Sequence, residues 1–173
     1  MRNDLTLMTA VAALLTVYSL GAMAKDGPGQ QFITKAVQGN LAEVAMGQLA
    51  QQKTSSAGVR SFGQMLEQDH SKANQEATAA ASSLNVTIPT EPNKQQEAAH
   101  DQMSKLSGNA FDRAFARHMV DDHKKDISAY EKEAKRSDGS VSEYAKATLP
   151  TLEKHLQTAR SLAQVGTRPS NVP

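Results

Sequence analysis

The stretch "FDRAFARHMVDDHKKDISAYEKEAKR" (111–136) decides the fold class that we expect for this chain. Its apolar side chains recur at intervals of three, four and eight residues: Phe111, Phe115, Met119, Ile127, Tyr130 and Ala134. Side chains three and four positions apart lie on one face of an α-helix. The stretch therefore predicts a long amphipathic helix over about 110–136 that turns one face toward a core.

The same periodicity predicts further helices over about 30–53, 57–84, 94–106 and 141–165, and no segment of any length alternates with the period of a strand. Turns at 54–58 and 137–140 are short, whereas two prolines break the chain within 85–93. We expect an all-α fold, a ferritin-like four-helix bundle with a short extra helix in the connection between helices two and three. A simple up-and-down connection also fits this pattern. Pro150 is expected to kink or split the last helix.

The composition limits the possible partners. The chain has 173 residues, which suggests one domain, and its few aromatic residues (4%) leave Ala, Leu, Val and Met to build the core. The 19 basic and 18 acidic residues give a net charge of +1 without a basic block, so nucleic acid is not an expected partner. Cysteine is absent, which excludes thiol catalysis, thiolate metal ligands and a lipid-attached cysteine.

The first 24 residues, "MRNDLTLMTAVAALLTVYSLGAMA", resemble a secretory signal peptide. Arg2 precedes an apolar run over 5–20, and Ala22-Met23-Ala24 provides small residues for cleavage. Asp4 weakens the basic start, so an uncleaved anchor is the alternative. We expect a signal peptide (1–24), a flexible lead (25–29), a bundle domain (30–165) and a disordered tail (166–173). The mature chain would be periplasmic or otherwise exported, without a membrane span.

Four segments then match a known family in order: "FITKAVQGNLAEVAMGQLAQQK", "VRSFGQMLEQDHSKAN", "LSGNAFDRAFARHMVDDHKKDISAYEKEAK" and "YAKATLPTLEKHLQTARSL". Together they resemble the bacterial family called domain of unknown function 4142, over about residues 30–163. The resemblance implies an exported ferritin-like bundle. It implies no catalytic residue.

Polar residues interrupt the apolar stripe of each long helix. Helical rotation of roughly 100° per residue places Glu43, His70, His123 and His155 on or beside the inner faces. Each lies roughly 18–25 Å from a helix end, at 1.5 Å per residue, so all four fall near one level. Three imidazoles and a carboxylate would suit zinc, copper or iron. Asp69 and Asp122 could orient these ligands or add a ligand, and Asp126 also falls near an inner face.

Two other readings fit the same residues. The histidines and carboxylates could form a buried polar network that fixes the helix register, or several of them could reach solvent. A standard di-iron site is not expected, because Glu67 and Glu153 fall on outer faces and only "EQDH" spells Glu-x-x-His.

The expected function is therefore a non-catalytic binding or envelope-stress role. No nucleophile motif or phosphate loop is present in the sequence. One alternative is a metal-binding or metal-dependent redox protein. Another is a module that binds protein partners or itself through helical faces, with Met46 and Leu49 on an outer face.

Overall fold

The computed structural model describes residues 27–137 and 139–165, and every regular element within them is helical. Four helices are long: α1 (Pro28–Lys53), α2 (Ala57–Ala80), α4 (Gly108–Ala134) and α5 (Ser140–Val165). A 3₁₀ turn (Ala81–Ser83) extends α2, and the short α3 (Lys94–Ser104) precedes α4. Helix α1 begins two residues before the expected position 30. Pro28 suits this start, because the first residues of a helix have no use for the N–H that proline lacks.

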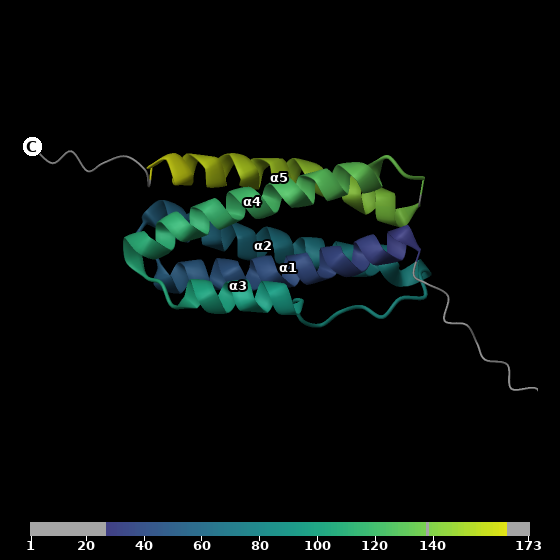
Figure 1. Ribbon diagram of the computed structural model, residues 1–173. Helices are drawn as coiled ribbons and strands as arrows, with labels where there is room; N and C mark the ends of the chain where they lie inside the picture. The colour runs from purple at the N-terminus through teal and green to yellow at the C-terminus, as the bar shows by residue number, and fades with distance from the viewer. Residues whose placement is uncertain (1–26, 138, 166–173) are drawn as a thin grey trace, which may run out of the picture.

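The helices pack side by side as a bundle. Helix α1 lies mainly against α2, and α4 lies mainly against α5, while α3 covers part of α1. Figure 1 shows that α1 and α2 run in opposite directions, as do α4 and α5. Helices α2 and α4 run in the same direction, because the chain between them returns along the bundle and carries α3 (Figure 1). Among the described helices, none is both long and apolar enough to cross a membrane.

Two glycines allow α1 and α2 to approach closely. A Cβ atom added at Gly47 would lie 2.5 Å from the carbonyl oxygen of Gly63, and one added at Gly63 would lie 2.7 Å from that of Gly47. The two helix backbones therefore touch at this crossing. The turn that joins them is closed by Ser56, whose Oγ accepts a hydrogen bond from the Val59 N–H (3.4 Å) at the start of α2.

Two details differ from the expectations drawn from the sequence. Pro150 does not split the last helix, because α5 is continuous over Ser140–Val165. Pro150 is exposed, while Thr148 and Leu152 on either side are buried and hold the helix against the core. Met46 and Leu49 do not lie on an outer face, because they are only 4% and 6% exposed and belong to the core. The helical wheel placed them incorrectly because it did not include α3, which covers part of this side of α1.

The apolar core divides into two clusters along the bundle. One cluster includes Ile33, Val37, Ala77, Tyr130, Tyr144 and Leu152. The other includes Met46, Phe62, Leu66, Phe115, Met119 and Ala159. On each long helix, buried polar residues fall in the sequence between the members of these two clusters: Asn40 and Glu43 on α1, His70 on α2, His123 on α4 and His155 on α5. The polar residues thus form a layer near the middle of the bundle.

Candidate metal centre

Three histidines from three helices meet in this polar layer. His70 (α2), His123 (α4) and His155 (α5) are 3%, 0% and 0% exposed. Each offers one ring nitrogen to a group whose members all lie within 4.8 Å of one another. The ring centroids are separated by 5.2 Å (His70–His155), 5.3 Å (His123–His155) and 5.8 Å (His70–His123). Three imidazoles are therefore concentrated at one buried point.

The hydrogen bonds of His70 and His123 fix where their protons lie. His70 Nδ1 lies 3.0 Å from Asn40 Oδ1, and His123 Nδ1 lies 3.0 Å from the Met119 carbonyl oxygen. Both oxygens can only accept, so each Nδ1 carries the proton. The Nε2 atom of each neutral ring is then left with a lone pair. His70 Nε2 is buried and has no hydrogen-bond partner.

His155 has the opposite arrangement. Its Nε2 lies 2.9 Å from Asp69 Oδ2, so the carboxylate accepts the Nε2 proton and the lone pair remains on Nδ1. This Nδ1 lies only 3.2 Å from His123 Nε2. With these tautomers two lone pairs face each other across this distance, and a shared proton or a metal ion would relieve their repulsion.

Burial keeps the histidines neutral. It lowers the pKa of His70 well below its ordinary value, and the neighbouring His123 and His155 lower it further. Burial and the neighbouring His155 lower the pKa of His123 to about 4. Burial also lowers the pKa of His155, although the Asp69 carboxylate opposes this change. Neutral imidazole is the form that binds metals, so the site needs little proton loss to accept a cation.

The donor set fits a first-row transition ion. Zinc–nitrogen bonds of about 2.0–2.1 Å in a tetrahedral site place ligand nitrogens about 3.3 Å apart. The 3.2 Å between His123 Nε2 and His155 Nδ1 is close to this separation. The second ring nitrogen of every histidine is held by an oxygen acceptor, as is usual for metal-binding histidines. Zinc, copper and iron all accept three imidazoles.

The structure does not bring Glu43 into this group. Glu43 is 2% exposed, and its Oε2 has no hydrogen-bond partner. Burial raises the pKa of Glu43 well above its ordinary value, and Asp122 and Asp126 raise it further, Asp122 also through a hydrogen bond. Burial likewise raises the pKa of Asp126 to about 7. Asp122 and Asp126 therefore accompany Glu43, whereas Asp69 alone among the predicted carboxylates binds one of the three histidines directly.

The residues that orient His70 (Asn40 and Tyr144) were not predicted from the sequence. Asn40 is 2% exposed, and its Nδ2 donates to the Tyr144 hydroxyl over 3.1 Å. That bond turns Asn40 Oδ1 toward His70. The Tyr144 hydroxyl lies 3.0 Å from that of Tyr130, so the two phenols extend the network into the neighbouring core cluster. The available signal was the position of Asn40 three residues before Glu43, on the same stripe of α1.

Two other glutamates and two other histidines lie away from the centre. Glu67 accepts hydrogen bonds from Gln48 (2.9 Å) and Gln51 (2.7 Å) on α1, and Glu153 is exposed. Both therefore lie outside the polar layer, as the helical phase predicted. His100 and His118 are partly exposed and do not join the three buried rings.

Comparison with known proteins supports the family resemblance. The family model described as "Domain of unknown function (DUF4142)" matches residues 19–162. Neither a curated protein nor a solved structure matches the sequence. The match covers the four long helices and all three histidines, apart from the last residues of α5. The chain is therefore a member of the domain of unknown function 4142 family.

Proposed function

We propose that this protein binds one transition-metal ion through His70, His123 and His155. One observation carries the proposal: an oxygen acceptor holds the proton of each ring on one nitrogen, and one ring nitrogen from each of the three histidines lies within 4.8 Å of the others in the buried core. A purely structural network would pair these nitrogens with donors. Here His70 Nε2 has no partner, and the close pair between His123 and His155 lacks a proton in the neutral state.

Binding without turnover suits the site better than catalysis. All three rings are at most 3% exposed, so a substrate would have to displace core side chains to reach the ion. Catalytic metal sites keep an open position for water or substrate. The proposal is thus a binding role, with zinc as the reference ion because three neutral imidazoles and no thiolate suit it well. Copper and iron are the competing ions.

The finer description of fold and compartment belongs to the same proposal. We infer a ferritin-like four-helix bundle, supported by the shared direction of α2 and α4 and by the long connection that carries α3 (Figure 1). We also infer export to the periplasm after cleavage of residues 1–24, which is supported by the apolar run and the Ala22-Met23-Ala24 signal.

Elemental analysis of the mature chain, purified without a histidine tag, tests the binding role. We expect about one metal ion per chain after incubation with zinc and gel filtration. Substituting cobalt for zinc should give the visible absorption bands of a tetrahedral Co²⁺ ion with nitrogen ligands. The double variant His123→Ala, His155→Ala should lose both signals.

Controls separate this site from surface binding. The variants His100→Ala and His118→Ala remove partly exposed imidazoles and should keep the full metal content. Circular dichroism must show that the double variant retains its helices. The proposal would be overturned by a wild-type chain that binds no zinc, copper or iron and whose melting temperature does not change when any of these ions is added.

A further inference from the structure

A cavity of about 210 Å³ lies beside the polar layer, between α1, the start of α3, and α4. Its lining has four chemical parts. Glu43 and Asp122 provide carboxyl groups, Met46 and Met119 with two alanines (Ala42 and Ala99) provide apolar surface, Asn93, Gln95 and Gln96 provide amides, and His118 and Lys125 provide basic groups. The cavity is far larger than the roughly 10–15 Å³ that one water needs. It can therefore hold a small organic molecule.

The carboxyl groups lack a cationic partner. Glu43 is 2% exposed, and its Oε2 is buried without any hydrogen-bond partner. Its carboxyl group shares a hydrogen bond with Asp122, which requires a proton on one of the two acids. Lys125 also borders the cavity, but its side chain is exposed and forms no ion pair with Glu43 or Asp122 within the described parts of the chain. The buried Glu43, beside the partly exposed Asp122, therefore has an unpaired oxygen that a ligand could satisfy.

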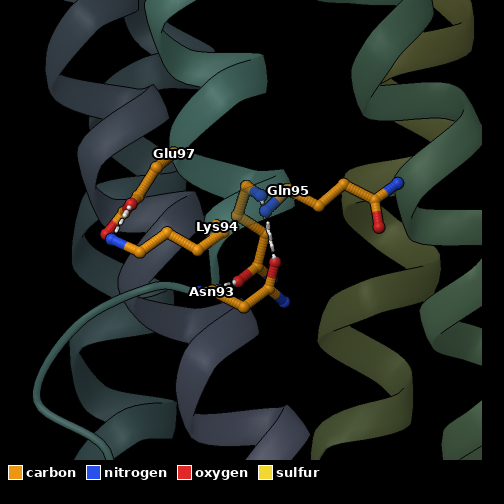
Figure 2. Close-up of polar contacts among 5 residues, drawn as sticks. Asn93, Lys94, Gln95 and Glu97 are labelled. Carbon is orange, nitrogen blue, oxygen red and sulfur yellow. Dashed lines mark hydrogen bonds and ion pairs between the residues drawn. The ribbon is translucent and has the colours of Figure 1, made fainter.

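The α3 side of the cavity is held in place before any ligand arrives. Asn93 Oδ1 accepts hydrogen bonds from the backbone N–H groups of Gln95 (3.0 Å) and Gln96 (3.1 Å). In return, the Asn93 N–H donates a hydrogen bond to Gln96 Oε1 (2.8 Å). Figure 2 shows this cap beside the ion pair between Lys94 and Glu97. The Gln95 side chain extends to the opposite side (Figure 2). A site whose wall is already ordered costs little conformational entropy to fill.

We propose that this cavity binds a small aliphatic primary ammonium ion, with Glu43 and Asp122 as its anionic end. An ammonium group has three N–H donors, which match the unpartnered Oε2 and the Asp122 carboxyl group. A short alkyl chain would lie against Met46 and Met119, whose flexible thioethers adapt to apolar ligands. Calcium and magnesium fit less well, because they require about six or more oxygen ligands and much of this lining is apolar.

The cavity borders the histidine centre, because Asp122 precedes His123 and the Met119 carbonyl oxygen accepts the His123 Nδ1 proton, so its test is carried out without bound metal. The probe is n-butylammonium, titrated into the metal-free mature chain carrying ¹³C-labelled methionine methyl groups. The neutral 1-butanol, which has a similar shape, serves as the matched ligand control. We expect saturable shifts of the Met46 and Met119 signals with butylammonium, and at least tenfold weaker binding of butanol.

Two variants and one control variant test the residues. Glu43→Gln keeps the shape but cannot become the carboxylate that would pair with a bound ammonium ion, so it should weaken butylammonium binding at least tenfold. Ala99→Leu should abolish binding by filling the cavity, while leaving Glu43 in place. Glu97→Gln lies on the same helix outside this cavity and should bind like the wild type.

Equal binding of butanol and butylammonium, or unchanged binding by Glu43→Gln, would show that the cavity recognises apolar shape alone and would overturn the proposal. Saturable shifts with Ca²⁺ or Mg²⁺ but not with butylammonium would also overturn it, in favour of a metal ion. Loss of binding in Glu97→Gln would assign the effect to another surface.

Discussion

Replacing Gly47 by alanine tests how the α1–α2 crossing supports the candidate metal centre. The added methyl group would lie 2.5 Å from the Gly63 carbonyl oxygen and 3.0 Å from the Glu67 backbone nitrogen. Neither atom belongs to a flexible side chain, so the two helices must move apart. Gly39 on the same helix provides the control, because a Cβ atom there would meet nothing within 4 Å.

The magnitude follows from two opposing effects. Alanine is favoured over glycine inside a helix by about 1 kcal/mol, which should stabilise Gly39→Ala by up to that amount. Overpacking costs about 1–3 kcal/mol, and contact with backbone atoms places Gly47→Ala at the upper end. We therefore expect Gly47→Ala to be destabilised by about 2 kcal/mol relative to wild type. The two variants should differ by about 3 kcal/mol, or about 6–12 °C in melting temperature.

Urea unfolding followed by circular dichroism measures the stability difference, and zinc titration gives a second readout. Asn40 lies on α1 and His70 on α2, and the 3.0 Å bond between them joins the same two helices about two turns from the Gly47–Gly63 contact. Moving the helices apart should lengthen that bond and weaken zinc binding by about tenfold in Gly47→Ala, with no change in Gly39→Ala. Equal stabilities for the two alanine variants would refute the close backbone contact. A destabilised Gly47→Ala with full zinc affinity would refute the link to His70.

Three further predictions concern the polar layer. Tyr144→Phe removes the hydroxyl oxygen that accepts a hydrogen bond from Asn40 Nδ2 over 3.1 Å. Zinc affinity should fall about 10-fold in a chelator competition assay while the helices remain intact. Unchanged zinc affinity would contradict the orienting role of Asn40. Burial lowers the pKa of His123 from 6.5 to about 4, so the stability that its neutral ring provides above pH 6.5 is lost as the pH falls toward 4. In urea unfolding, the stability advantage of wild type over His123→Gln should shrink by as much as about 3 kcal/mol across that interval. A difference that does not change with pH would contradict this prediction. Burial raises the pKa of Asp126 from 3.8 to about 7, so its carboxyl group favours folding below pH 3.8 and opposes folding increasingly up to pH 7. The stability gained by Asp126→Asn should therefore grow between pH 4 and pH 7 and level off above pH 7. A stability gain that falls as the pH rises would contradict the raised pKa.

The sequence by itself determined the helices and the residues that interrupt their apolar faces. Helical spacing placed Phe111, Phe115 and Met119 on one inner face, and each of the three is 0% exposed. Helical phase also placed His70, His123 and His155 inward at one level. Such periodicity is a local property of each segment, so it can be read from the sequence without knowing which helices pack against that segment.

Only the tertiary structure decided which of these groups meet. Glu43 shares the level of the histidines but lies with Asp122, because the angle and spacing of neighbouring helices are set by contacts such as Gly47 against Gly63. The role of Asn40 depends on Tyr144, 104 residues away in the chain. The helical phase of one segment carries no information about its distance from another, and a metal site depends on those distances.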